Sequence, residues 1–249
     1  MVPQEFVTGL AIFTCMPTTL SSGVALTQLV GGNTALALAM TVVSNLLGIL
    51  IVPILLSNFI ADGAGVTIPT GQLFRGLVIT LLVPLILGKI SRDYISGVAK
   101  YVDQNRKLLS MTSAVLLSLV PWMQVSKSRS LLLMVRPIIF LIAIGLGLLL
   151  HLILLALNTL AAKSLSIISG GRTSVFTKNE NFRALVMVTS QKTLPVMVAV
   201  VEQLRGAFGE SGLLILPCVA AHINQIIFDS FLVSFWLRKD QSSNPLKEA

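Results

Sequence analysis

Two clusters of polar residues, each built around a proline, carry the side chains best suited to binding chemistry. They contain Thr18, Thr19, Ser21 and Ser22 after Pro17, and Gln191, Lys192 and Thr193 before Pro195. Hydroxyl and amide oxygens bind cations, whereas ammonium and hydroxyl hydrogens bind anions. Proline lacks an N–H and clashes with the preceding turn, so each cluster predicts a helix break with free backbone groups. Such breaks are typical of ion and anion sites in membrane transporters.

The elements that must position these clusters are long apolar segments. The chain has 249 residues, 54% hydrophobic and 11% charged, whereas soluble domains carry about 25% charged residues. Seven apolar segments lie at roughly 7–28, 33–56, 72–90, 108–125, 131–158, 183–204 and 211–237. About 20 apolar residues cross a bilayer as a helix. We therefore predict an all-α membrane protein with about seven transmembrane helices in the lipid bilayer.

The basic residues lie in the loops between these segments. The formal net charge is +8. Binding to nucleic acid requires basic residues clustered on one face together with aromatic or polar side chains that contact the bases. The sequence shows no such cluster, so we expect no nucleic-acid partner. If the segments alternate in direction, one side receives most of the basic residues, including Lys100 and Arg106. The other side receives fewer, including Arg75 and Arg205. The richer side should face the cytosol or a similar compartment.

The two clusters also predict an internal repeat. The stretches beginning at Phe13 and Val188 both show a polar cluster with a proline, an apolar half-helix, a glycine-containing break and another long segment. In an alternating topology the two copies run in opposite directions, as an inverted repeat requires. The alternative is a pair of kinks stabilised by serine and threonine side chains.

Lys192 is the single residue that indicates function most strongly, because a charge inside a membrane has a high free-energy cost unless it faces a cavity or a partner. It could attract an anionic substrate, take the place of a bound cation, or pair with Asp229, the one acid deep in an apolar segment. Alternatively, its side chain extends to the membrane interface.

Further polar residues lie on the apolar segments that follow the clusters. His222, Asn224 and Gln225 lie close together on the last segment, and Ser44 and Asn45 hold an equivalent place in the second. We favour hydrogen bonds between helices over a proton relay for both groups. His151 is interpreted as structural. No HExxH, GxSxG, P-loop or paired intramembrane aspartates occur, so no enzyme and no catalytic residue is expected.

The run PTTLSSGVALTQLVGGNTALALAMTVVSNLLGILIVP resembles the fourth and fifth helices of the bile acid:sodium symporter family. VTSQKTLPVMVAVVEQLRGAFGESGLLILPCVAAHINQ is similar to the ninth and tenth helices of its plant plastid-type sodium/metabolite cotransporters. The resemblance implies ten helices in two inverted five-helix repeats, with a core domain and a panel domain. Residues 1–60 would be the end of the first repeat and 61–249 the second, so the chain would lack the first three helices.

The resemblance also implies a partial set of sodium ligands. Ser22 or Gly23, Thr41 and Gln191 fall on ligand positions of the family, so Na⁺ is a candidate metal and coupling ion, and no other cofactor is expected. Ala37 and Met187 stand where the family has a serine and a shared acidic ligand. Sodium binding should therefore be weakened or lost in this chain.

These observations together predict a secondary transporter of a small organic anion, with Na⁺ as a candidate coupling ion. The expected binding residues are Thr18, Thr19, Ser21, Ser22, Thr41, Gln191, Lys192 and Thr193. The resemblance implies that the protein lies in the plastid (chloroplast) envelope. A homo-oligomer is a candidate assembly. The alternative is a truncated membrane protein that regulates or assembles partners without transporting.

Overall fold

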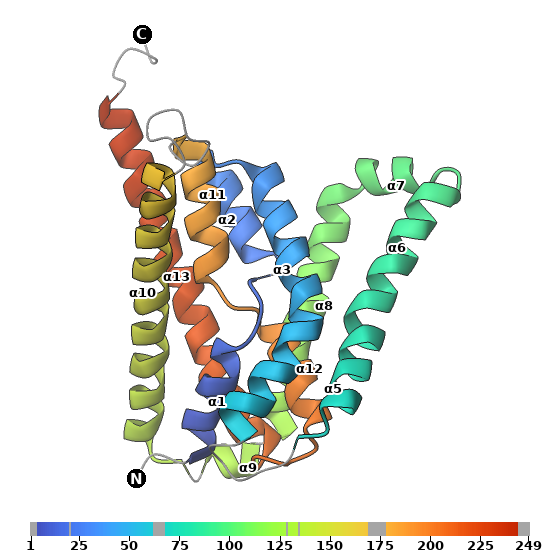
Figure 1. The fold of residues 1–249 in the computed structure, drawn as a ribbon, viewed down its shortest axis with the longest axis vertical. Coiled ribbons are helices and arrows are strands. Elements are labelled where there is room, and N and C mark those ends of the chain that lie inside the picture. Colours follow the sequence, from blue (N-terminus) through green and yellow to red (C-terminus); the bar gives the residue numbers. More distant parts are fainter. Residues whose placement is uncertain are drawn as a thin grey trace. The chain divides into compact units, whose positions relative to one another are not determined.

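The computed structural model describes residues 4–19, 21–61, 68–127, 129–133, 135–168 and 178–243, and the regular elements in these ranges are helices (Figure 1). Within the described residues, four helical stretches are long and apolar enough to cross a membrane: Thr34–Ile60, Thr70–Tyr94, Pro137–Ile168 and Ser211–Ser242. The prediction of an all-α, multi-pass membrane protein is confirmed. The number of seven crossings stays a prediction.

The chain forms two compact units, of which the first comprises Met1–Met16, Leu46–Ile139 and Leu194–Pro217. Its elements are α1 (Gln4–Thr14), η1 (Leu56–Ala61), α5 (Thr70–Leu77), η2 (Val78–Leu82), α6 (Val83–Tyr94), α7 (Val98–Gln104), α8 (Arg106–Lys127), α9 (Arg129–Leu132) and α12 (Leu194–Gln203). Helix α12 packs against α5 and α8, and α1 packs against η1 and α12. α12 thus holds this unit together.

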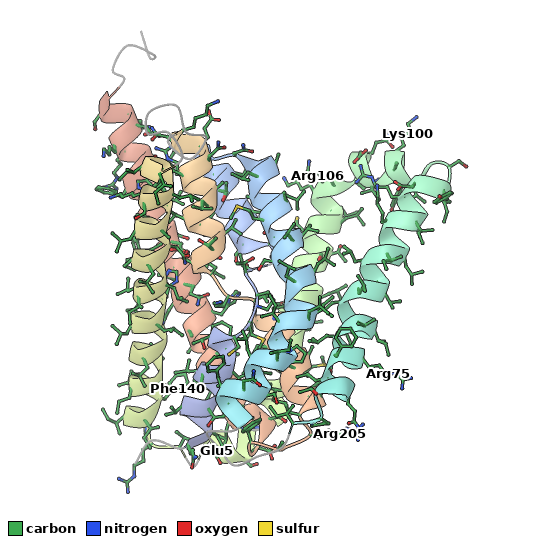
Figure 2. The ribbon with its side chains drawn as sticks, viewed as in Figure 1. Glu5, Arg75, Lys100, Arg106, Phe140 and Arg205 are labelled. Atoms are coloured by element: carbon green, nitrogen blue, oxygen red, sulfur yellow. The ribbon has the colours of Figure 1, made fainter. Side chains whose placement is uncertain are left out.

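Charged residues mark the helix ends of the first unit. Figure 2 shows Arg75 and Arg205 at one end of its helices, and Lys100 and Arg106 at the opposite end. This is the separation that alternating segments predict, and it leaves the apolar stretch of α5, η2 and α6 between charged ends. Much of that stretch is exposed, including Ile79, Leu85 and Ile86, as a lipid-facing helix requires.

The second unit comprises Pro17–Asn45, Phe140–Thr193 and Cys218–Ala249. It contains α2 (Ser22–Leu29), α11 (Asn179–Ser190) and the larger parts of α10 (Pro137–Ile168) and α13 (Ser211–Ser243), with the first half of α3 (Thr34–Leu55). Helices α2 and α11 lie side by side (Figure 1). The proposed binding residues all fall in this unit.

Small residues allow close helix packing in the second unit. A Cβ added at Gly147 of α10 would collide with Ala221 of α13, and one at Gly23 of α2 would press on Thr19 and on the backbone of Val188 in α11. Close backbone approach at small residues is the usual basis of helix association in lipid, where apolar burial gives no driving force.

Most of the predicted segment boundaries hold within a few residues, but the last segment, predicted to end at 237, continues to Ser243 in α13, and α10 differs at both ends. The segment predicted at 131–158 is α10, which runs over Pro137–Ile168. The helix begins later than predicted because proline favours the first helical turn. It ends later than predicted because it continues past the apolar run through Asn158 and Lys163. The division into repeats at 1–60 and 61–249 stays a prediction.

Candidate functional site

The first predicted helix break is confirmed. Helix α1 ends at Thr14 and α2 begins at Ser22. The backbone N–H groups of Cys15 and Met16 still bond to the last turn of α1, and Pro17 then prevents the helix from continuing. Thr18, which lies between the two half-helices, takes part in an isolated β-bridge.

The second predicted break has the same form. Helix α11 ends at Ser190 and α12 begins at Leu194. Gln191 has extended backbone angles, with φ −91° and ψ 142°. Pro195 lies in the first turn of α12, where its missing N–H costs nothing. Both proline clusters therefore interrupt their helices, as the sequence predicts.

The two breaks pair with each other as antiparallel extended segments. Thr18 forms a bridge with Lys192. The flanking hydrogen bonds join these backbone groups: Thr19 N–H to Gln191 O at 3.2 Å, and Thr193 N–H to Pro17 O at 3.1 Å. Backbone groups that two broken helices would leave unpaired at membrane depth are thus satisfied by each other. We call this pairing the crossing.

At the first break, side chains of α3 bind both polar groups of the Thr18 backbone. The N–H of Thr18 donates to Ser44 Oγ at 3.1 Å. The carbonyl of Thr18 accepts from Asn45 Nδ2 at 3.1 Å, and the same nitrogen donates to Thr41 O at 2.8 Å. Ser44 and Asn45 therefore stabilise the extended segment.

At the second break, α13 performs the same task for Lys192. Its N–H donates to Gln225 Oε1 at 3.1 Å, and its carbonyl is 3.1 Å from His222 Nδ1, which must donate because a carbonyl only accepts. This confirms hydrogen bonding between helices for His222 and Gln225. Asn224 faces another neighbour and donates to the carbonyl of Ile144 in α10.

The predicted binding residues are brought together to different degrees. Thr19, Thr41, Gln191 and Thr193 are buried, Thr18, Ser22 and Lys192 are half-buried, and Ser21 is exposed. Thr18, Thr19, Gln191, Lys192 and Thr193 belong to the crossing itself. Ser21 precedes α2 without a side-chain cap bond and is the member least connected to the others.

A buried chain of hydrogen bonds extends from the crossing into α13 and α10. Thr19 Oγ1 is 2.6 Å from Ser22 Oγ, which donates to Gln191 Oε1 at 2.6 Å. Gln191 Nε2 donates to Asp229 Oδ2 at 2.5 Å, and the other oxygen of Asp229 is 2.9 Å from His151 Nε2. The chain thus joins two helix breaks to a buried ionisable pair.

Sequence reasoning missed the partnership of His151 and Asp229. Both side chains have zero exposure, and His151 packs edge-on against Phe228 with ring centroids 5.9 Å apart. Asp229 was noted as a candidate partner of Lys192, and His151 was interpreted only as structural. The signal that could have paired them is that buried charges need partners, since both lie deep in apolar segments.

Several buried polar atoms at the crossing lack a hydrogen-bond partner among the described residues. At the first break they are Thr18 Oγ1, Thr41 Oγ1 and Asn45 Oδ1; at the second they are Thr193 Oγ1 and Gln225 Nε2. The amide orientations are well determined, because Asn45 Nδ2 faces two carbonyls and Gln225 Oε1 faces an N–H. Unsatisfied buried groups are costly and commonly mark ligand sites.

Two positions that the resemblance associates with sodium ligands are apolar core here. Met187 is fully buried with Leu26, Val30 and Val233. Ala37 is fully buried between Ala184 and Val188. Neither position can supply an oxygen from its side chain, and the effect on sodium binding stays a prediction.

Comparison with known proteins gives two plant relatives of high similarity. The chain is 63% identical over 239 residues to the "Probable sodium/metabolite cotransporter BASS4, chloroplastic" of Oryza sativa subsp. indica, covering 96% of this chain and 56% of the relative. It is 62% identical over 242 residues to the protein of the same name from Arabidopsis thaliana, covering 97% and 55%. The chain spans about half the length of these relatives.

A more distant similarity extends to animals. The sodium/bile acid cotransporter 7-B of Xenopus laevis is 28% identical over 226 residues, covering 90% of this chain and 62% of the relative. These relatives are named as transport proteins and not as enzymes. Residues 1–238 match the SBF-like CPA transporter family. The paired broken helices and this match lead to one conclusion: the chain belongs to the SBF-like CPA transporter family.

Proposed function

We propose that the protein is a secondary transporter that moves a small organic anion together with Na⁺ through a site at the crossing. Its relatives are named sodium/metabolite and sodium/bile acid cotransporters. Because the plant relatives are named chloroplastic, the proposal includes a plastid membrane. It includes no further cofactor, and whether the protein forms a homo-oligomer stays a prediction.

The observation that carries the proposal is the chemical contrast between the two sides of the crossing. Among the described residues, the unpartnered groups at the first break are the hydroxyls of Thr18 and Thr41, which can accept or donate, and the amide oxygen of Asn45, which only accepts. Oxygen atoms of this kind are the ligands that hard cations prefer. The first break therefore suits a cation better than an anion.

The second break offers donors. Gln225 has an unpartnered amide NH₂ and Thr193 an unpartnered hydroxyl, and the ammonium of Lys192 belongs to the same break. Charge-assisted hydrogen bonds to a carboxylate are about twice as strong as neutral ones. A small organic anion is therefore the substrate class that fits this side.

The candidate cation ligands at the crossing are neutral. Met187 provides no carboxylate, and the oxygens of Ser22 and Gln191 already take part in the chain of hydrogen bonds. A cation would therefore gain its charge compensation from the anionic substrate. This makes binding of the two solutes mutually favourable, which is the energetic requirement for cotransport.

The test is uptake of radiolabelled small carboxylates into proteoliposomes that contain the full-length protein. We expect uptake to require an inward Na⁺ gradient, and Lys192→Ala to abolish it. Lys100→Ala, which removes an exposed lysine of α7, should transport normally. The proposal in this form is wrong if a broad panel of carboxylates shows no uptake, or if Lys192→Ala transports at the normal rate. Absence of uptake would favour a regulatory or assembly role without transport.

A further inference from the structure

The buried pair of His151 and Asp229 has a specific relation to the crossing. Both residues and Gln191 have zero exposure, so their hydrogen bonds are shielded from water and strongly directional. His151 lies on α10, Asp229 on α13, and Gln191 in the second break. Three separate segments thus converge on one carboxylate.

The donors and acceptors in this chain can be assigned from the chemistry of its members. The carboxylate oxygen of Asp229 accepts from the amide NH₂ of Gln191. The amide oxygen of Gln191 consequently faces Ser22 and accepts its hydroxyl hydrogen. A serine hydroxyl has one hydrogen, so the bond between Thr19 and Ser22 must use the hydrogen of Thr19.

The hydrogens of all three groups therefore point toward Asp229. The far end of the chain, at Thr19 Oγ1 in the crossing, carries oxygen lone pairs instead of a hydrogen. If the amide of Gln191 were rotated by half a turn, its NH₂ would donate to Ser22, and the hydroxyl of Ser22 could then donate to Thr19. The hydroxyl hydrogen of Thr19 would then be released from the chain and could point to the side where its lone pairs now point.

We infer that Asp229, held by His151, is a positioning residue that fixes the direction of this chain and thereby makes the crossing a cation site. The inference deepens the proposed function and rests on it. Asp229 does not touch the cation; it acts through Gln191. Outer partners of this kind commonly change metal affinity by about 10- to 100-fold when they are removed.

His151 supports the carboxylate from behind. Its Nδ1 is 3.3 Å from the carbonyl of Ser190, which only accepts, so this nitrogen carries a hydrogen. The edge-on contact with Phe228 fixes the plane of the imidazole ring. Both ring nitrogens of His151 are thus hydrogen-bonded, which fixes the orientation of the ring. One carboxylate oxygen of Asp229 contacts His151, and the other accepts from Gln191.

Two substitutions at the same position separate orientation from charge. In Asp229→Asn the new amide can present its oxygen to Gln191 and its NH₂ to His151, so the direction of the chain is retained without the charge. In Asp229→Leu no acceptor remains for Gln191, and the direction is released. Glu180→Gln, at an exposed carboxylate of α11, is the control for loss of a negative charge.

The first measurement is Na⁺ affinity of the full-length protein in detergent, obtained from the rise in melting temperature with Na⁺ concentration, with K⁺ as the reference. We expect Glu180→Gln to match the wild type, Asp229→Asn to stay within about threefold, and Asp229→Leu to bind Na⁺ about 10- to 100-fold more weakly. Wild-type affinity in Asp229→Leu overturns the inference. The inference is also overturned if Asp229→Asn binds Na⁺ as weakly as Asp229→Leu does. The Na⁺ affinity would then depend on the charge at position 229 and not on the direction of the hydrogen-bond chain.

The second measurement observes the contact between Gln191 and Asp229 directly in the wild type. The protein is labelled with ¹⁵N in its glutamine side chains and ¹³C in its aspartate carboxyls. Solid-state NMR should then show a short contact between the Gln191 amide nitrogen and the Asp229 carboxyl carbon. This contact should disappear in Gln191→Leu and persist in Asp229→Asn when asparagine carries the ¹³C label. Absence of this contact in the wild type overturns the inference. A wild type with the contact but without any Na⁺ effect instead contradicts the proposed function, so the two failures are distinguishable.

Discussion

The two helix breaks share one backbone design and differ in side-chain chemistry. At each break an extended residue, Thr18 or Lys192, is held by two side chains from the long helix that follows in the sequence. Only the second break carries a lysine and a buried ionisable pair behind it. The backbone design serves the fold, because broken helices in lipid need every polar group paired. The difference in side chains is where selectivity can arise.

The largest expected effect concerns the feature that only the second break has. Replacing either His151 or Asp229 by leucine leaves a buried polar partner uncompensated, so we expect a loss of about 3–5 kcal/mol in unfolding free energy. The double substitution should be less destabilising than the sum of the two. Unfolding in detergent by increasing SDS, analysed as a double-mutant cycle, checks this. Strict additivity would contradict a direct partnership.

The next effect concerns the support that both breaks have in common. Ser44→Ala removes the acceptor of the Thr18 N–H, and Gln225→Leu removes the acceptor of the Lys192 N–H. Each should cost about 1–3 kcal/mol, because a buried donor is left unsatisfied. The same unfolding assay should give similar values for the two.

Ser230→Ala is the control for these variants, since Ser230 is exposed and bonds only within its own helix. A large cost at one break with none at the other would show that the two breaks are not supported alike.

A smaller effect is expected from close packing beside the first break. Gly23→Ala places a methyl group against Thr19 and the backbone of Val188. We expect a cost of about 1 kcal/mol, at the low end for overpacking, because the strain at buried Thr19 is partly offset by the higher helix propensity of alanine. The melting temperature should fall relative to Gly145→Ala, whose new methyl group meets open space. Equal melting temperatures would mean that α2 and α11 separate easily.

The smallest change in stability is expected when the two breaks are made alike. Lys192→Thr leaves the bridge intact, because Thr18 and Lys192 pair through their backbones. We expect only a small change in the unfolding free energy, because the backbone pairing that holds the break is retained. Anion uptake should nevertheless be lost. A folded, transporting Lys192→Thr variant would place the anion site elsewhere.

The sequence alone predicted much of the fold. Hydropathy and proline positions are local properties, so the long helices and both breaks could be located within a few residues. The main exception is the far end of α10, where the helix continues after the apolar residues stop. Hydropathy measures contact with lipid, whereas a helix ends where its backbone hydrogen bonds end.

The residues of the crossing could be predicted in part for the same reason. Gln191, Lys192 and Thr193 stood out because polar groups inside an apolar segment need a reason. The sequence could not reveal that Thr18 lies opposite Lys192, since the two residues are far apart in the chain and their pairing depends on how the helices assemble.

What the sequence determined by itself is therefore where the helices break and which polar groups the breaks contain. Only the tertiary structure decided that His151 and Asp229 meet, that Gln191 lies between Asp229 and Ser22, and that Met187 is core. Hydropathy and helix-breaking act within a few neighbours along the chain. Hydrogen-bond direction and burial depend on atoms contributed by distant segments, and these become defined only when the helices pack.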